Sequence, residues 1–392
     1  MKRSVVTIGV ILAVLGAGYP ARAAATVSPW TLMVYLRTDG GLAQAAAGYV
    51  EQFCAAAGPD VRVVAQIEDA QRPGEGRRLV VAADSAKWEP GEVRGDMGSA
   101  EAFADFLRWA QDRAPAQRYA LVILAHGDPP SGELEAPRGS LRAEAVAAGL
   151  AQPGLSVPEV VFFDCCYTGS LQTASSLAGK ARYLVASTGL LYAPGLPWGS
   201  IVKRLSANAS MSGRDLTVVA LEEARRFWAR EALPAGLVIV DLRRVPELEL
   251  AVEELATAAI PVMEELVADL TAARGRSASW GPRGEIVEVG AFAAALAQLT
   301  PLKTVAECAR AVGEAADAAT VAVWSQHLSS NEEEVGGLGI DFPLGLAATG
   351  RPAGGGAARA GSWERLMSAY SRHMRGQMQA AAATGSLPRS VK

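Results

Sequence analysis

Residues 121–127 read Leu-Val-Ile-Leu-Ala-His-Gly, an apolar run that ends abruptly on a histidine. Residues 160–169 read Val-Val-Phe-Phe-Asp-Cys-Cys-Tyr-Thr-Gly, a second apolar run that ends on an acid and two cysteines. Apolar runs without alternation are typical of strands that are buried on both faces, as in parallel sheets. In such sheets, ligands and reactive groups gather just beyond the carboxyl ends of the strands. The two runs therefore predict both the centre of a parallel sheet and its functional edge.

Similar runs recur along the first 240 residues, and segments with helical periodicity separate them. The segments 42–53 and 99–113 place apolar side chains at the i, i+3 and i+4 spacing of a helix. This alternation predicts an α/β fold with a mostly parallel sheet and helices on both faces. Residues 77–83 interrupt the alternation and are interpreted as an inserted hairpin. The other predicted strands are 32–36, 61–67, 184–186 and 237–240.

The pattern changes at about residue 206. Long helical stretches follow at 215–231 and 246–274, with brief strand candidates at 286–289 and 338–342. We therefore predict an α/β core over residues 27–205 and a helix-rich region over residues 206–392 that packs on this core.

The amino-terminal residues 1–23 have the pattern of an export signal. Lys2 and Arg3 precede an apolar run of about 13 residues, and Ala21-Arg22-Ala23 provides a small-x-small cleavage site. The run is shorter than the roughly 20 residues that span a bilayer. We expect an exported protein, secreted or periplasmic, that has no membrane anchor once the signal is removed.

Composition excludes several classes of protein. The chain has 392 residues, a net charge of -4 and 50% hydrophobic residues, which is ordinary globular usage. Because no block of basic residues is present, we do not expect nucleic acid as a partner. The 3 histidines argue against a metal site with three histidine ligands. The 4 cysteines are too few for a disulfide scaffold, and in an exported protein they either pair or serve chemistry.

His126 and Cys166 follow the two apolar runs at equivalent places. Their separation of 40 residues fits a single crossover through a helix over residues 140–151. The two residues should then lie at the ends of neighbouring strands, about 5 Å apart at the backbone. A histidine beside a thiol lowers the thiol pKa and can return the proton to a leaving group. Backbone N–H groups of Gly127 and Cys166 are candidates for holding an oxyanion.

Spacing alone leaves other interpretations open. A histidine after a strand can be an ordinary hydrogen-bonded residue, and a buried cysteine can simply fill space as a small hydrophobe. The adjacent Cys165 and Cys166 could form a vicinal disulfide, or could pair with Cys54 or Cys308.

Several segments together resemble the clostripain family of cysteine peptidases. They occur in the family's order and spacing, and the resemblance covers nearly the whole mature chain. The segments are Trp30–Leu36, Asp96–Gly98, Phe106–Trp109, Tyr119–Gly127, Phe163–Ser170, Leu237–Leu242 and Gly337–Pro343.

The resemblance implies a caspase-like three-layer sandwich and a cysteine endopeptidase that acts on protein or peptide substrates. His126 matches the catalytic histidine, Cys166 matches the nucleophile, and Gly127 would supply an oxyanion N–H group. Cys165 then occupies the position of a neighbour, which is an alanine in the family.

The resemblance also implies a substrate pocket. Asp164 matches an aspartate that, in family members, helps to line the pocket for a basic substrate side chain before the scissile bond. Ser187 and Thr188 would form another wall of this pocket. Asp39 matches a further acidic position at the same edge of the sheet.

Departures from the family pattern keep some questions open. Residues 190–198 contain no acid, although a preference for Arg or Lys normally requires a second carboxylate. Arg138 offers a self-cleavage site in the loop after His126. We predict no metal and no cofactor, but calcium activation stays open because only part of the family shows it. We expect a monomer. A transpeptidase with the same dyad and a peptide-binding pseudopeptidase are the alternatives.

Overall fold

The computed structural model describes residues 27–38, 42–72, 74–83, 85–127, 141–281, 284–326, 337–342 and 361–383. The predicted signal segment 1–23, Asp39 and the loop that contains Arg138 lie outside the described residues.

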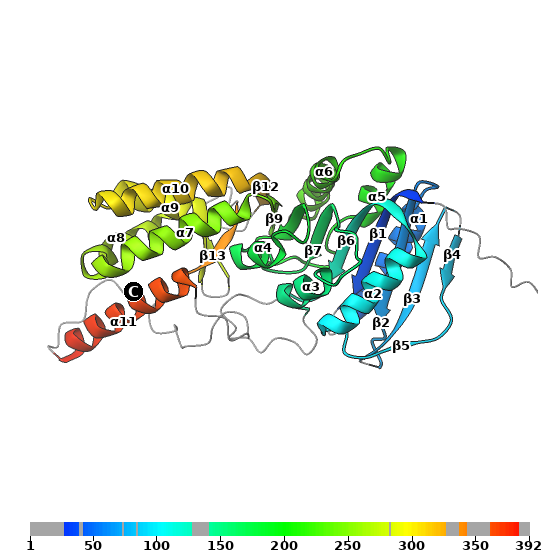
Figure 1. Cartoon of the computed structure of the whole chain (residues 1–392), viewed down its shortest axis with the longest axis horizontal. Helices are drawn as coiled ribbons and strands as arrows, with labels where there is room; N and C mark the ends of the chain where they lie inside the picture. Colours follow the sequence, from blue (N-terminus) through cyan, green and yellow to red (C-terminus); the bar gives the residue numbers. More distant parts are fainter. Residues whose placement is uncertain are drawn as a thin grey trace, which may run out of the picture.

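One sheet forms the centre of the molecule (Figure 1). Within the described ranges it contains ten strands in the order β12-β9-β8-β7-β6-β1-β2-β3-β4, with β5 paired to β3. The five strands from β8 to β2 in this order are parallel, whereas the strands at both edges are antiparallel. The bounds are β1 (Ser28–Leu36), β2 (Val61–Glu68), β3 (Glu75–Ala82), β4 (Ser85–Trp88), β5 (Val93–Arg94), β6 (Ala116–Leu124), β7 (Val160–Asp164), β8 (Tyr183–Ser187), β9 (Ala235–Asp241) and β12 (Thr320–Gln326).

The apolar runs form the buried middle of this sheet. All residues of β7 are buried, as are the last six residues of β6. Strands with both faces covered gain stability from apolar burial along their whole length, which explains why these runs lack alternation. A hairpin is present here, but with wider bounds than predicted: residues 77–82 belong to β3, which pairs antiparallel with β2, and β4 then pairs antiparallel with β3.

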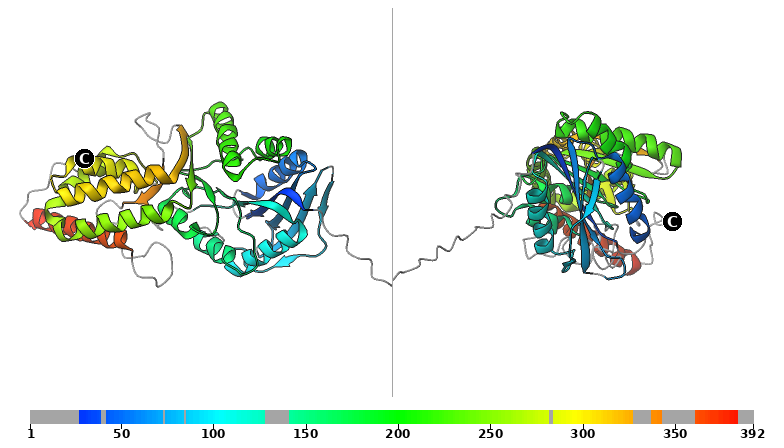
Figure 2. Two further views of the ribbon diagram at one scale, coloured as in Figure 1. Left: turned by 45° about the horizontal axis from the view of Figure 1, so that its top comes forward. Right: turned by 90° about the vertical axis from the view of Figure 1, so that its right-hand side faces the viewer.

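Helices cover both faces of the sheet, which gives the predicted three layers (Figure 2, right). Successive side chains of a strand point to opposite faces. Met33 and Tyr35 of β1 therefore belong to the apolar cluster that includes α2, α3 and α4, while Leu32 and Val34 belong to the cluster that includes α1, α5 and α6. The bounds are α1 (Leu42–Ala56), α2 (Ala100–Arg113), α3 (Ala143–Leu150), α4 (Leu171–Leu177), α5 (Trp198–Ala207) and α6 (Gly213–Glu231).

The remaining helices gather beyond the β9 and β12 edge of the sheet (Figure 1). They are α7 (Val245–Ala259), α8 (Met263–Arg276), α9 (Val289–Leu299), α10 (Lys303–Ala319) and α11 (Ser362–Ala383). A small antiparallel sheet of β10 (Ser279–Trp280), β11 (Ile286–Glu288) and β13 (Gly339–Asp341) lies among them. Among the described segments, no helix combines the length and the apolar character that crossing a bilayer requires.

The single helix predicted over residues 246–274 is wrong, because a 3-10 turn at Ile260–Val262 separates α7 from α8. Pro261 lies in this turn and cannot donate the hydrogen bond that a continuous helix needs. The division of the chain at residue 205 stays a prediction, and the central sheet itself continues past it through β9 and β12.

Candidate active site

The predicted dyad residues lie at the same edge of the sheet. Strands β6 and β7 are hydrogen-bonded neighbours that pair Leu124 with Asp164. His126 and Cys166 each lie two residues beyond this pair, and both are half-buried. The Cys166 thiol contacts Leu191, which packs on the same apolar cluster as Leu124.

Gly127 lies directly against the backbone of Cys166. A methyl group at Gly127 would fall 1.7 Å from the carbonyl oxygen of Cys166, 2.7 Å from its carbonyl carbon and 2.8 Å from its nitrogen. No side chain can be accommodated at these distances. The His-Gly pair and Cys166 therefore adjoin through their backbones, and this contact requires glycine at position 127.

The Cys166 thiol contacts the backbone of Leu191. The N–H group of Leu191 donates to Sγ over 3.3 Å, and the thiol lies 3.7 Å from the carbonyl oxygen of Leu191, to which it can donate. Burial raises the pKa of the Cys166 thiol, and the charge of Asp164 adds to this rise, whereas the Leu191 N–H group opposes it. Formation of the thiolate at neutral pH therefore needs a base or a further positive group nearby.

Cys165 points away from this site into the core. Its side chain is buried among the apolar residues of the opposite face, and its thiol donates to the carbonyl oxygen of Ile123 over 3.5 Å. Burial raises the pKa of this thiol well above its usual value. All four cysteines are free in the described structure, so none of the alternative disulfides is present.

Backbone hydrogen bonds on two sides hold the turn after Cys166. Tyr167 has a φ of 56°, a left-handed conformation that is uncommon for a residue with a side chain. Its N–H group donates to Gly189 over 2.9 Å, and the N–H group of Gly169 donates to Ser187 over 2.7 Å. On the other side, the N–H group of Gly339 donates to Gly169 over 2.9 Å. The turn after Cys166 is therefore fixed between the end of β8 and the small sheet.

Asp164 is almost completely buried, with 6% of its surface exposed. Its Oδ2 atom accepts hydrogen bonds from the indole Nε1 of Trp198 at 2.8 Å and from the backbone of Leu196 at 3.1 Å. Its Oδ1 atom has no hydrogen-bond partner among the described residues. Burial raises the pKa of Asp164 to about 7, although the two N–H donors oppose this rise.

Ser187 and Thr188 lie beside Asp164, because β7 and β8 pair Phe163 with Ala186. The Ser187 hydroxyl donates to the carbonyl oxygen of Gly189 over 2.9 Å, while the Thr188 hydroxyl has no partner in the described part of the chain. Both side chains are fully buried. The structure thus brings the three predicted pocket residues together, and their role in binding substrate stays a prediction.

The raised pKa of Asp164 predicts a pH-dependent stability that asparagine removes. The folded chain retains the Asp164 proton up to about pH 7, whereas the unfolded chain loses it near the ordinary value of 3.8. This group therefore stabilises the fold fully below about pH 4, and the contribution is lost as the pH rises to about 7. The melting temperature of Asp164→Asn, relative to that of the wild type, should rise between pH 4 and pH 8. A difference that stays constant across this range would contradict the buried, protonated state.

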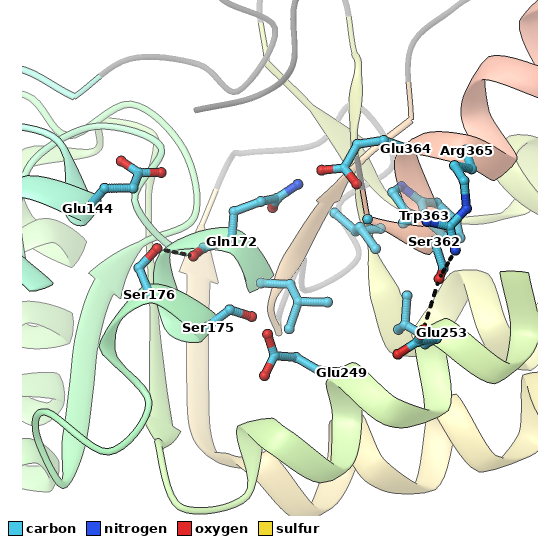
Figure 3. A pocket seen from close by; sticks show the side chains of 14 residues that line it. Glu144, Gln172, Ser175, Ser176, Glu249, Glu253, Ser362, Trp363, Glu364 and Arg365 are labelled. Atoms are coloured by element: carbon cyan, nitrogen blue, oxygen red, sulfur yellow. Dashed lines mark hydrogen bonds between the residues drawn. The ribbon is translucent and has the colours of Figure 1, made fainter. Parts of the chain in front are cut away.

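A separate cleft of about 680 Å³ lies next to the start of α4 (Figure 3). Side chains from α3, α4, α7 and α11 surround it, and it includes neither His126 nor Cys166. No local motif marks this cleft in the sequence, because its residues come from distant parts of the chain. Its charged side chains are Glu144, Glu249, Glu253, Glu364 and Arg365.

Comparisons with known proteins agree with this architecture. Residues 146–322 match the sequence model of the clostripain family, a stretch that contains Cys166 and begins after His126. No match is found among curated protein sequences. A secreted C11 cysteine protease from Bacteroides thetaiotaomicron has a TM-score of 0.62 and 16% identity, over 81% of this chain and 94% of that chain.

Two further solved structures are similar. An inactive zymogen C11 protease from Parabacteroides distasonis has a TM-score of 0.61 and 16% identity, over 81% of this chain and 93% of that chain. A secreted C11 cysteine protease from Bacteroides thetaiotaomicron in complex with an irreversible peptide inhibitor has a TM-score of 0.61 and 12% identity, over 88% of this chain and 99% of that chain. At these identities the structural likeness shows the fold, and the family match adds the cysteine-peptidase relationship. Together they show that residues 146–322 resemble the clostripain family and that the chain shares the fold of C11 cysteine proteases.

Proposed function

We propose that this cysteine peptidase is an exported endopeptidase that uses a dyad of Cys166 and His126. The observation that carries the proposal is the backbone contact between Gly127 and Cys166 at the ends of adjoining parallel strands. Because His126 directly precedes Gly127, this contact supports a dyad of a half-buried histidine and a half-buried thiol at the end of the sheet where reactive groups gather.

In the proposed mechanism, His126 first takes the proton from the Cys166 thiol. The thiolate attacks the carbonyl carbon of the scissile peptide bond, and the negative charge moves to the carbonyl oxygen. His126 then gives its proton to the leaving amine as the C–N bond breaks, which leaves a thioester on Cys166. A water molecule, deprotonated by His126, attacks the thioester and releases the acid and the free thiol. These steps use no cofactor.

Two features of the site support this chemistry. The thiol pKa is raised by burial, so a base at the position of His126 is needed to generate the thiolate. The N–H group of Gly127 lies on the backbone that adjoins the nucleophile, where it could donate to the developing oxyanion.

We also propose that cleavage follows Arg or Lys. The Oδ1 atom of Asp164 is a buried acceptor without a hydrogen-bond partner in the described structure. Leaving a buried acceptor unpaired is costly, and a substrate cation close to this carboxylate would offset that cost. Export is supported by the signal pattern of residues 1–23 and by the similarity to a protease described as secreted.

A panel of fluorogenic peptides that differ only before the scissile bond tests the proposal. The mature chain is assayed under reducing conditions, with and without calcium, and His126→Ala serves as the inactive control. We expect cleavage after Arg or Lys that the control lacks. Cleavage after another residue would retain the dyad and reject the basic pocket. If no peptide is cleaved, the peptide-binding pseudopeptidase is favoured, and if an added amine is incorporated into the product, the transpeptidase is favoured.

A further inference from the structure

The segment 189–197 joins β8 to α5 and contacts the Cys166 thiol through Leu191. Leu191 supplies the N–H group that donates to Cys166 Sγ. Its neighbours Leu190 and Tyr192 are 42% and 40% exposed, so packing alone does little to hold this part of the segment. The position of the Leu191 N–H group therefore depends on how the two ends of the segment are anchored.

The first end is anchored at Gly189. Its carbonyl oxygen accepts hydrogen bonds from the N–H group of Tyr167 and from the hydroxyl of Ser187, each at 2.9 Å. Tyr167 belongs to the turn after Cys166, and Ser187 belongs to β8. This end of the segment is therefore fixed to the sheet.

The second end is anchored by Asp164. One oxygen of this carboxylate binds both the backbone N–H group of Leu196 and the indole N–H group of Trp198. Trp198 is fully buried, and its ring packs edge-on against Phe162 of β7 at 5.2 Å and tilted against Phe53 of α1 at 5.8 Å, measured between ring centroids. The indole is thus fixed by the core, and the carboxylate joins it to the strand that carries the nucleophile.

We infer that Asp164 and Trp198 are positioning residues, which hold the segment 189–197 so that the Leu191 N–H group stabilises the Cys166 thiolate. A hydrogen bond to the charged form of a group favours that form, so the Leu191 N–H group increases the fraction of thiolate. This inference rests on the proposed function of Cys166 and adds a second role for Asp164, which uses Oδ2 and leaves Oδ1 for substrate.

Trp198→Phe tests the inference, because phenylalanine keeps a buried ring and removes the indole donor. The pH dependence of the iodoacetamide alkylation rate, followed for each cysteine by mass spectrometry, gives the pKa of Cys166 without any need for peptidase activity. We expect this pKa to rise by roughly half a unit to one unit, and kcat to fall about tenfold with a smaller change in KM. The backbone amides of the segment 189–197 should also exchange hydrogen faster.

Trp228→Phe is the matched control. Trp228 is fully buried in the same apolar cluster, and its indole nitrogen has no hydrogen-bond partner in the described structure. This variant loses a comparable part of the core and no hydrogen bond, so the thiol pKa and the exchange rates should match those of the wild type. An equal effect in both variants would show general loosening and would overturn the inference.

Two outcomes keep the inference separate from the proposed function. If the wild type cleaves no peptide, the proposed function fails, while the thiol pKa of Trp198→Phe still tests the positioning role. If Trp198→Phe does not fold, Asp164→Asn replaces the charge-assisted hydrogen bonds with weaker neutral ones and should raise hydrogen exchange in the segment 189–197 at pH 8. Unchanged exchange in Asp164→Asn, or an unchanged thiol pKa in folded Trp198→Phe, would overturn the inference.

Discussion

Cys166→Ala should lower kcat/KM for peptide hydrolysis by at least about 10⁴-fold, because it removes the atom that forms the thioester. The fold should persist, since Cys166 is half-buried and its thiol contacts only one backbone segment through hydrogen bonds in the described structure. Steady-state kinetics with the best fluorogenic peptide, together with the melting temperature, measure both effects.

The adjacent cysteine provides the matched control. Cys165→Ala removes a thiol that lies in the core on the opposite face of the sheet. It should cost about 1 kcal/mol of unfolding free energy through lost packing and keep kcat/KM within about tenfold of the wild type. If Cys165→Ala were inactive and Cys166→Ala active, the assignment of the nucleophile would be reversed.

Gly127→Ala should have the second largest effect. The added methyl group would overlap the Cys166 backbone, at 1.7 Å from its carbonyl oxygen. Both atoms belong to backbone at the ends of paired strands, so relief requires the strand ends to separate. We expect kcat/KM to fall by about 100-fold or more and the unfolding free energy to fall by about 2 kcal/mol. Kinetics and denaturant unfolding of the same preparation measure the two quantities.

Gly48→Ala controls for the substitution itself. Gly48 lies within α1, and a methyl group there meets no atom within 4 Å. Because alanine favours a helix over glycine, this variant should gain about 0.5–1 kcal/mol and retain its activity. Wild-type activity and stability in Gly127→Ala would contradict the close backbone contact between residue 127 and Cys166.

The sequence was sufficient to predict the middle of the sheet and the equivalent positions of His126 and Cys166 beyond two neighbouring strands. The runs at β6 and β7 are apolar throughout because helices cover both of their faces. The offset of 40 residues between His126 and Cys166 equals that between the paired residues Leu124 and Asp164. The single crossover between β6 and β7 therefore leaves His126 and Cys166 at equivalent positions beyond the two strands.

Other features lacked a local signal. Strand β12 is only half-buried along most of its length and directly follows the long helix α10, so no apolar run or turn sets it apart. The hydrogen bond from Trp198 to Asp164 joins residues 34 positions apart, and no spacing rule connects a tryptophan with a carboxylate. Long-range side-chain contacts of this kind emerge only when the segment 189–197 folds back over the strand ends.

Labelling with an irreversible peptide-based alkylating reagent tests the dyad most directly. The mature chain is treated under reducing conditions, and peptide mapping by mass spectrometry gives the labelling rate of each cysteine. Our account predicts that Cys166 reacts at least about 100-fold faster than Cys54 or Cys308, and that His126→Ala abolishes this difference. Equally slow labelling of all cysteines in the folded wild type would contradict it.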